Sequence, residues 1–188
     1  MKSSTAGSLS PEFVLLGLLT RGPAHGYELH QKLTLDLCQI WNLSQSQVYN
    51  ILSRLEGKGF IRGRIQEQEK LPARRMLEIT EAGQGHFNNW MFAPSRLSVR
   101  AIRIELTTRL YFAQDAEPGL ADEIITRQIT ETKIGLERLI LTRSSIPEDQ
   151  IFNHLGLDLR IRQLGSILDW LDSCRAKISS DPTLDRSI

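Results

Sequence analysis

The chain has 188 residues, of which 40% are apolar and 24% charged, and its formal net charge at pH 7 is +1. This composition is that of a folded globular protein and argues against extended disorder. No window approaches the roughly 18 uninterrupted apolar residues of a membrane helix, and we expect no secretory signal. We expect a disordered tail at residues 1–8 and a frayed one at 181–188. The two cysteines, Cys38 and Cys174, lie far apart, which favours the reducing cytoplasm over a disulfide scaffold.

Basic side chains are concentrated in one segment. Residues 54–75 contain seven basic and three acidic side chains, a local balance of 7 − 3 = +4. Residues 93–188 contain 13 basic and 14 acidic ones, a balance of 13 − 14 = −1. A basic segment beside a near-neutral half indicates separate DNA-binding and assembly parts. An ordinary solvated surface would carry the same charges, so the order of the predicted elements has to decide.

Two helices are expected before residue 40. Ser10 and Pro11 suit a helix start, because a serine hydroxyl accepts from free amides and proline fits the first turn. The run FVLLGLL (residues 13–19) is apolar all round and should be buried, and the RGP sequence at 21–23 ends it. A second helix is expected from about Ala24, with a buried face marked by leucines four apart at Leu29, Leu33 and Leu37.

The third helix, expected from Ser44 to Lys58, is the most completely specified element. Ser44 and Gln47 have the spacing of a capping box, and Gly59 suits a left-handed helix end. One apolar stripe follows the helical repeat: Val48, Ile51, Leu52 and Leu55. The opposite face is polar and consists of Gln45, Ser46, Tyr49, Asn50, Ser53 and Arg54.

A hairpin and a fourth helix follow. The segments IRGRI (61–65) and RRMLEI (74–79) alternate in the manner of strands, and the polar stretch 66–73 between them contains Lys70. Thr80 is expected to cap a helix whose buried side uses Phe87, Trp90 and Met91 and which Pro94 ends. Three helices followed by a basic hairpin predict a winged helix-turn-helix domain over residues 9–93.

The remaining sequence predicts three helices, at about 96–113, 118–142 and 147–178. The last has an apolar seam spaced by four and three residues: Leu157, Ile161, Leu164, Leu168 and Leu171. We interpret residues 95–180 as a C-terminal antiparallel helical dimerisation domain, with this seam at the dimer contact. The same stripe could instead close a bundle within one chain. The expected fold class is therefore mainly α, with a small β-hairpin wing.

The predicted third helix and hairpin are suited to DNA. A helix fits the major groove, where glutamine and asparagine can pair with adenine and hydroxyls can contact bases or phosphates. Basic side chains further along the helix and on the wing would contact phosphates and set salt-dependent affinity. The predicted DNA-binding residues are Gln45, Ser46, Tyr49, Asn50, Arg54, Lys58, Arg64, Lys70 and Arg74.

Three motifs in this region resemble those of the PadR family of bacterial transcription regulators. They are HGYEL (25–29), VYNILSRLEGKGFI (48–61) and LEITEAG (77–83), and the resemblance covers roughly residues 9–92. It implies a winged-helix homodimer, usually a repressor, that releases double-stranded operator DNA on binding a small aromatic or drug-like effector. It also implies that Tyr49 and its neighbours touch DNA. Asn50 stands where the family commonly has proline, so a base contact there would be particular to this protein.

The sequence also allows other interpretations. Trp41 and Trp90 could line an apolar effector pocket, or they could be ordinary core residues. The histidines and cysteines show no metal-ligand spacing and no catalytic motif is present, so neither a metal, a cofactor nor an enzyme is expected. The alternatives are a helical protein-interaction module without DNA binding, or a MarR-like regulator, in which dimer helices usually flank the winged helix on both sides.

Overall fold

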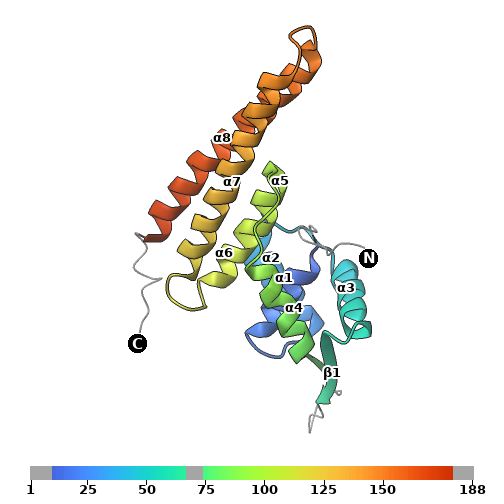
Figure 1. Cartoon of the computed structure of the whole chain (residues 1–188). Helices are drawn as coiled ribbons and strands as arrows, with labels where there is room; N and C mark the ends of the chain where they lie inside the picture. Colours follow the sequence, from blue (N-terminus) through green and yellow to red (C-terminus); the bar gives the residue numbers. More distant parts are fainter. Residues whose placement is uncertain (1–9, 67–73, 180–188) are drawn as a thin grey trace. The chain divides into compact units, whose positions relative to one another are not determined.

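The computed structural model describes residues 10–66 and 74–179, which form two compact units, one ending at Ala93 and the other beginning at Pro94 (Figure 1). The predicted tails at 1–8 and 181–188 lie outside the described residues, as does the hairpin tip at 67–73. Within the described ranges, no helix has both the length and the apolar character needed to cross a membrane.

The first unit has the predicted order of three helices, a hairpin and a fourth helix. These elements are α1 (Glu12–Thr20), α2 (Gly26–Leu37), α3 (Gln45–Gly57), β1 (Ile61–Gln66), β2 (Arg74–Ile79) and α4 (Glu81–Met91). The first helix is the centre of the core, since Val14, Leu15 and Leu16 are fully buried. Because α1 is apolar all round, α3, α4 and β2 can pack on its different sides, which gives a small unit a single core.

Both ends of α3 have the predicted local structure: two hydrogen bonds define its start, and a left-handed glycine follows its end. The Gln47 amide donates to the Ser44 hydroxyl over 3.3 Å, and the Gln47 side chain accepts from the Ser44 amide at 2.8 Å. These two bonds satisfy amides that the first helical turn leaves free. At the other end, Gly59 has φ of 73°, the left-handed conformation that glycine adopts without a steric penalty.

The two strands form an antiparallel hairpin in which Ile61 pairs with Ile79 and Gly63 with Leu77. A short bridge extends this sheet, because Ala24 and Leu77 exchange two backbone hydrogen bonds of 3.0 Å each. The segment before α2 is thereby attached to β2. The hairpin and the helix-turn-helix are consequently parts of one folded unit.

The second unit contains α5 (Val99–Ala101), η1 (Ile102–Leu106), α6 (Thr107–Ala113), α7 (Leu120–Ser145) and α8 (Ile151–Ser179). The expected single α-helix over 96–113 is wrong in two respects. It begins only at Val99, because the Ser98 hydroxyl accepts from the Ala101 amide at 3.2 Å, and its middle turn is a π-helix. The other two helices also begin later than expected: Gly119, with φ of 88°, precedes α7, and a turn at 147–150 precedes α8.

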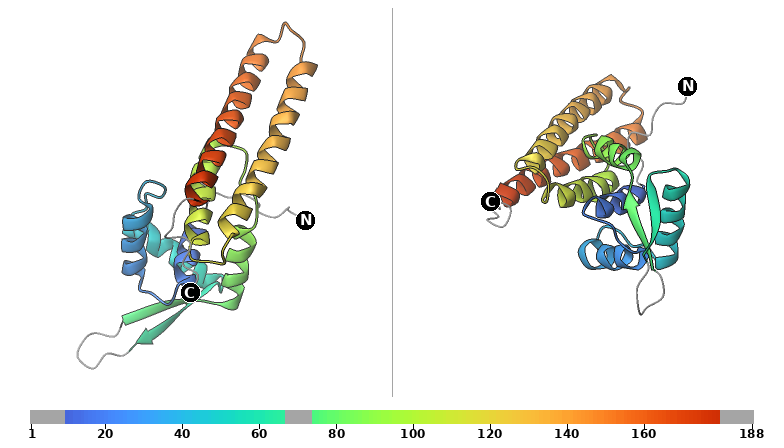
Figure 2. Two further views of the ribbon diagram at one scale, coloured as in Figure 1. Left: turned by 90° about the vertical axis from the view of Figure 1, so that its left-hand side faces the viewer. Right: turned by 90° about the horizontal axis from the view of Figure 1, so that it is seen from below.

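Helices α7 and α8 pack side by side as a long antiparallel hairpin (Figure 2). Leu164 and Leu171 of the predicted seam are buried within the chain, and an added Cβ on Gly135 of α7 would lie 3.7 Å from Leu164. Leu157, Ile161 and Leu168 are half-buried. Packing within one chain thus accounts for part of this stripe, and the dimer contact of the seam stays a prediction.

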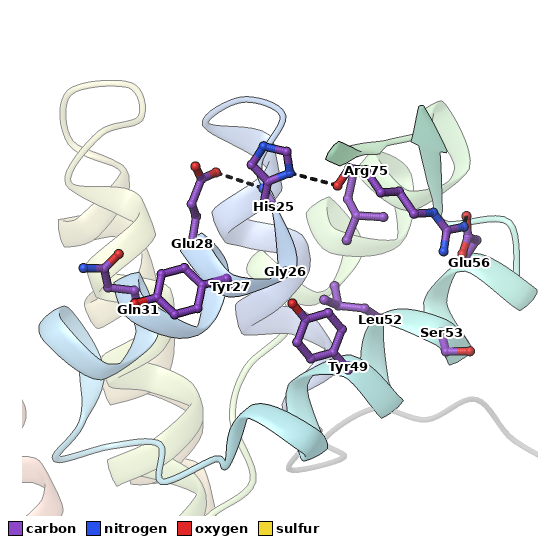
Figure 3. Close-up of a pocket in the computed structure, with 11 residues that line it drawn as sticks. His25, Gly26, Tyr27, Glu28, Gln31, Tyr49, Leu52, Ser53, Glu56 and Arg75 are labelled. Carbon is purple, nitrogen blue, oxygen red and sulfur yellow. Dashed lines mark hydrogen bonds and ion pairs between the residues drawn. The ribbon is translucent and has the colours of Figure 1, made fainter. Parts of the chain in front are cut away.

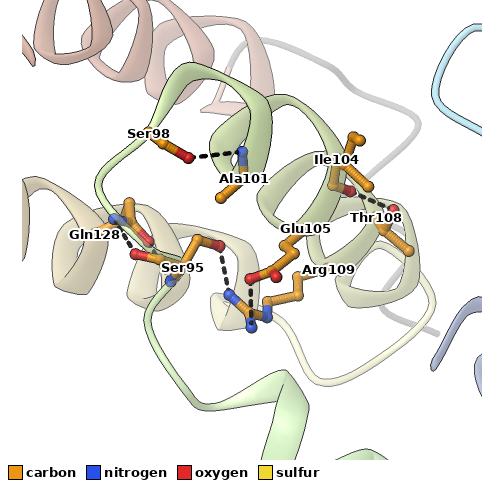
Figure 4. A network of polar contacts seen from close by, with 8 residues as sticks. All are labelled: Ser95, Ser98, Ala101, Ile104, Glu105, Thr108, Arg109 and Gln128. Carbon is orange, nitrogen blue, oxygen red and sulfur yellow. Dashed lines mark hydrogen bonds and ion pairs between the residues drawn. The ribbon is translucent and has the colours of Figure 1, made fainter. Parts of the chain in front are cut away.

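A buried polar network crosses the core of this unit (Figure 4). Glu105 and Arg109 are each 1% exposed and lie 3.5 Å apart. The Arg109 guanidinium donates to the Ser95 hydroxyl over 2.6 Å, and Gln128 bonds both the amide and the carbonyl of Ser95, at 2.8 and 3.2 Å. Burial raises the pKa of Glu105, against the attraction of Arg109, and lowers the pKa of Arg109 to about 10. The core therefore holds a buried ion pair at the π-helical turn, and the arginine of this pair also donates a hydrogen bond to Ser95.

Candidate nucleic-acid interface

The outward face of α3 is polar and exposed. Val48, Ile51, Leu52 and Leu55 are buried against the unit, between 0 and 5% exposed. This burial directs the remaining side chains to solvent. The exposed set contains all six residues predicted for this face, together with Gln47: Gln45, Ser46, Tyr49, Asn50, Ser53 and Arg54. The helix is anchored by its apolar stripe and its capping box, so its polar face is presented by a rigid element. Side chains held in this way can contact base edges in the major groove.

A groove of about 710 Å³ lies between the start of α2, the middle of α3 and β2 (Figure 3). The rings of Tyr27 on α2 and Tyr49 on α3 line this groove. Tyr27 is 57% exposed and Tyr49 is 47% exposed. Gly26 lets the start of α2 approach the Tyr49 ring closely, because a Cβ at this position would lie 2.8 Å from that ring. Two phenolic hydroxyls and the amide of Gln31 give the groove hydrogen-bonding groups suited to phosphate oxygens.

His25 attaches the start of α2 to the wing. Its Nδ1 donates to the carbonyl oxygen of Arg75 over 3.0 Å, and its backbone amide donates to the Glu28 carboxylate over 2.9 Å (Figure 3). A carbonyl only accepts, so this contact requires the proton on Nδ1. His25 is thus a hydrogen-bonded residue at the junction between α2 and β2.

Glu56 attaches α3 to both strands of the wing. Its Oε1 accepts from the backbone amide of Gly63 at 3.1 Å and pairs with the Arg75 guanidinium at 2.6 Å. The Arg75 side chain lies so close over Gly63 that a Cβ there would be 2.4 Å from its Nε. Glu56 thus helps to fix the hairpin relative to α3, and the absence of a side chain at Gly63 leaves room for Arg75.

The basic side chains of the interface are paired with carboxylates. Glu12 lies within 3.5 Å of Arg54 and within 3.2 Å of Lys58. On the wing, Glu78 pairs with Arg64 at 2.7 Å and also with Arg62. Sequence reasoning missed these acidic partners, because Glu12 precedes Lys58 by 46 residues. The exposed arginines and the lysine are available to phosphates only in competition with these carboxylates.

Two predicted contacts cannot be placed. Lys70 lies in the hairpin tip, outside the described residues, and for Arg74 only the backbone, in β2, is described. Tyr27 also lines the groove, which was not predicted, because the helical repeat places it close to the buried leucine face of α2, whereas it is exposed. Arg75 was not among the predicted DNA-binding residues, yet it lines the groove.

Trp41 and Trp90 are 8% and 6% exposed. Trp90 stacks on Phe13 of α1, with ring centroids 4.9 Å apart, which is an ordinary core arrangement. Neither tryptophan lines the groove beside α3. Their participation in an effector pocket therefore stays a prediction. Among residues 10–66 and 74–179, no group of three or more histidine, cysteine, aspartate or glutamate side chains could hold a metal ion.

Three helices, an antiparallel hairpin and an exposed polar third helix define a winged helix-turn-helix protein of the transcription-regulator class. Residues 15–89 match the Transcriptional regulator PadR-like family, and residues 102–179 match the family described as Virulence activator alpha C-term. Residues 15–89 therefore form a domain of the PadR-like family of transcriptional regulators. The family resemblance and the mainly α winged-helix fold are thus confirmed, as is the prediction that the chain is a regulator and no enzyme.

The relatives include the negative transcriptional regulator PadR of Bacillus subtilis (strain 168). It is 24% identical over 179 residues, which cover 90% of this chain and 98% of the relative. Bacillus subtilis PadR in complex with operator DNA matches with a TM-score of 0.45 and 24% identity, over 89% of this chain and 97% of that one. The same protein in complex with p-coumaric acid matches with a TM-score of 0.40 and 23% identity, over 90% and 98%.

Proposed function

We propose that this protein is a ligand-responsive repressor that binds a pseudo-palindromic operator as a homodimer. The observation that carries the proposal is the exposed polar face of α3, anchored by a buried apolar stripe and joined to a wing through Glu56. A two-fold dimer would present two such helices to successive major grooves, roughly 34–36 Å apart. Since its ligand is then chromosomal DNA, we also propose the cytoplasm as its location.

Within this proposal, the residues of α3 have two roles. Gln45, Ser46, Tyr49 and Asn50 contact base edges, because they are exposed on the first two turns of a capped helix. The cations contact phosphates and carry no sequence information of their own. They are Arg54, Lys58, Arg64, Lys70 and Arg74.

Repression and release by a ligand are proposed from the family and its Bacillus subtilis relative. That relative is a negative regulator by name, and its solved complexes contain operator DNA and p-coumaric acid. We propose a small aromatic effector for this chain as well, with Trp41 and Trp90 as candidate lining residues. Dimer formation is assigned to the second unit, through the seam that ends at Leu171.

Fluorescence anisotropy with the full chain and a duplex from its own promoter tests the proposal. Asn50→Ala should weaken promoter binding by roughly 1–3 kcal/mol, which is the usual contribution of one base contact, and leave binding to a random duplex unchanged. Asn89→Ala is a matched control, since Asn89 is equally exposed but lies on α4. Adding p-coumarate should release the promoter duplex. Absence of promoter binding at every salt concentration would overturn the proposal in favour of a protein-interaction module.

A further inference from the structure

Carboxylates neutralise much of the positive charge of the proposed DNA interface. Glu12, Glu56 and Glu78 lie within 3.5 Å of five basic side chains, which are Arg54, Lys58, Arg62, Arg64 and Arg75. The local charge of these eight groups is 5 − 3 = +2. Phosphate affinity depends on the cations that are free to replace condensed counterions. The three carboxylates therefore affect how strongly this surface attracts any DNA.

Glu12 differs from the other two carboxylates in two ways. It lies on α1, outside both α3 and the wing, and it is nearly buried. It lies in the first turn of α1, with 12% of its side chain exposed. The Lys58 ammonium donates to both of its oxygens, at 3.3 and 3.2 Å, and an Arg54 nitrogen lies 3.5 Å from Oε1. The two cations themselves remain half exposed, at 60% and 51% of their side chains. The carboxylate thus lies beneath two cations that solvent, or a phosphate, can still reach.

This arrangement limits what the two cations can offer to DNA. With Glu12 between them, the group of three has a net charge of 2 − 1 = +1. A phosphate that approaches Arg54 or Lys58 must displace the carboxylate or accept its repulsion. Each cation that is fully available to a phosphate adds about 0.9 to the slope of log affinity against log salt. Glu12 thereby withholds up to two such contacts.

We propose that Glu12 is a positioning residue that limits the sequence-independent DNA affinity of this regulator by competing with the phosphate backbone for Arg54 and Lys58. The inference rests on the proposed DNA-binding function. It leaves the reading of bases to the first two turns of α3, which Glu12 does not touch. A regulator with restrained phosphate affinity dissociates faster, so a modest effector-induced change is enough to release the operator.

The competing interpretation is that Glu12 only tethers α3 to α1. The buried stripe of α3 already provides that attachment, since Val48 and Leu55 are completely buried. A tether and an affinity limit have opposite consequences for DNA binding. Loss of a tether would weaken binding, whereas loss of the limit strengthens it and makes it more sensitive to salt.

The experiment compares Glu12→Gln with the wild type in the full chain. Anisotropy titrations use two labelled duplexes of equal length, one from the protein's own promoter and one of random sequence, over a range of salt concentrations. We expect Glu12→Gln to steepen the salt slope by about 1–2 and to raise affinity for both duplexes roughly three- to tenfold near 0.1 M salt. Glutamine keeps the size of the side chain and removes only its charge.

Glu81→Gln is the matched control, because it changes the net charge equally at an exposed position on α4 where no ion pair is described. Its salt slope should equal that of the wild type. In a chain that already carries Arg54→Gln and Lys58→Gln, adding Glu12→Gln should no longer change the slope. An unchanged slope or weaker binding in Glu12→Gln alone would overturn the inference and leave Glu12 as a tether. A wild-type protein that binds neither duplex would instead overturn the proposed function itself.

Discussion

The Glu56 carboxylate and the Arg75 guanidinium lie 2.6 Å apart and join α3, the proposed recognition helix, to β2, the second strand of the wing. The same carboxylate oxygen accepts from the Gly63 amide of the first strand. One acidic side chain in the last turns of α3 thus contacts both strands. In a winged helix the distance between these elements decides whether helix and hairpin can reach adjacent parts of the duplex together.

Glu56→Ala should weaken promoter binding several-fold and lower the free energy of unfolding by about 1 kcal/mol, because the Gly63 amide loses its acceptor and Arg75 its partner. Urea denaturation and anisotropy measure the two effects. Glu123→Ala is the control: this residue pairs with Arg127 on the exposed side of α7 and should change promoter affinity little. Undiminished promoter affinity in Glu56→Ala would mean that the wing is positioned by other contacts.

Gly26→Ala should weaken promoter binding with a small change in stability. The new Cβ would lie 2.8 Å from the Tyr49 ring, and this half-exposed ring can move away into the groove. The Tyr49 hydroxyl then leaves its present position in the groove, which Tyr27 also lines. If Tyr49 contacts DNA, Gly26→Ala combined with Tyr49→Ala should bind no more weakly than Tyr49→Ala alone. Full additivity of the two losses, measured by anisotropy, would contradict a shared mechanism.

Gly83→Ala and Gly85→Ala should have opposite effects on stability, although both glycines lie in α4. A Cβ on Gly83 would be 2.0 Å from the backbone oxygen of Phe60, whereas Gly85 has no atom within 4 Å of such a Cβ. We expect Gly83→Ala to cost at least the roughly 1–3 kcal/mol that is typical of overpacking. Gly85→Ala should stabilise by up to about 1 kcal/mol through helix propensity. Thermal or urea unfolding tests both, and equal effects would refute the close approach at Phe60.

Arg109→Met should destabilise the second unit by roughly 3–5 kcal/mol, because it leaves the carboxylate of Glu105 buried without its cation. Replacing both residues, with Glu105→Leu and Arg109→Met together, should restore most of the loss, since no buried charge remains. Arg127→Met provides a control with the same spacing at an exposed pair, where a change below about 1 kcal/mol is expected. If the double variant is as unstable as Arg109→Met, the network stabilises the unit through the hydrogen bond from Arg109 to Ser95 and not through the ion pair.

The stability of the first unit should fall as the pH drops below about 6.5, in part because of His86. Burial between Phe13 and Phe60 lowers the pKa of His86 below its ordinary value of 6.5, Glu12 opposes this shift and Lys58 adds to it. The unfolded chain then takes up a proton near pH 6.5, while the folded chain does so only at lower pH. Between these two values protonation favours unfolding, so stability is complete above 6.5 and is lost towards the folded pKa.

His86→Phe keeps the ring stack and removes the titrating group. The difference in urea midpoint between wild type and His86→Phe should therefore change between about pH 7.5 and about pH 5.5, in the direction of a relative gain for the variant at low pH. This comparison isolates His86, because the other histidines and the carboxylates are common to both proteins. A difference that is constant with pH would contradict the lowered pKa.

Short-range interactions explain why so much of α3 could be predicted. The Ser44 capping box, the apolar stripe that ends at Leu55 and the left-handed Gly59 each depend on residues within a few positions of one another. Hydrogen-bonding groups at those spacings meet in any helix, whatever surrounds it. The family motifs are likewise short contiguous stretches that can be recognised without the tertiary structure. The solvent-facing side of the helix, which we propose contacts DNA, follows from these features by elimination.

Only the tertiary structure decided which charges are free and which apolar stripes are already covered. Glu12 meets Lys58 across 46 residues, and Ser95 meets Gln128 across 33, so no local pattern announces either contact. Glu105 and Arg109 have the spacing of an ordinary exposed helix pair, yet packing buries both. Likewise Leu164 and Leu171 of the predicted seam are buried within the chain, in a helix that packs on α7. Local sequence determines what a segment can form, but burial and charge pairing depend on residues that only folding brings together.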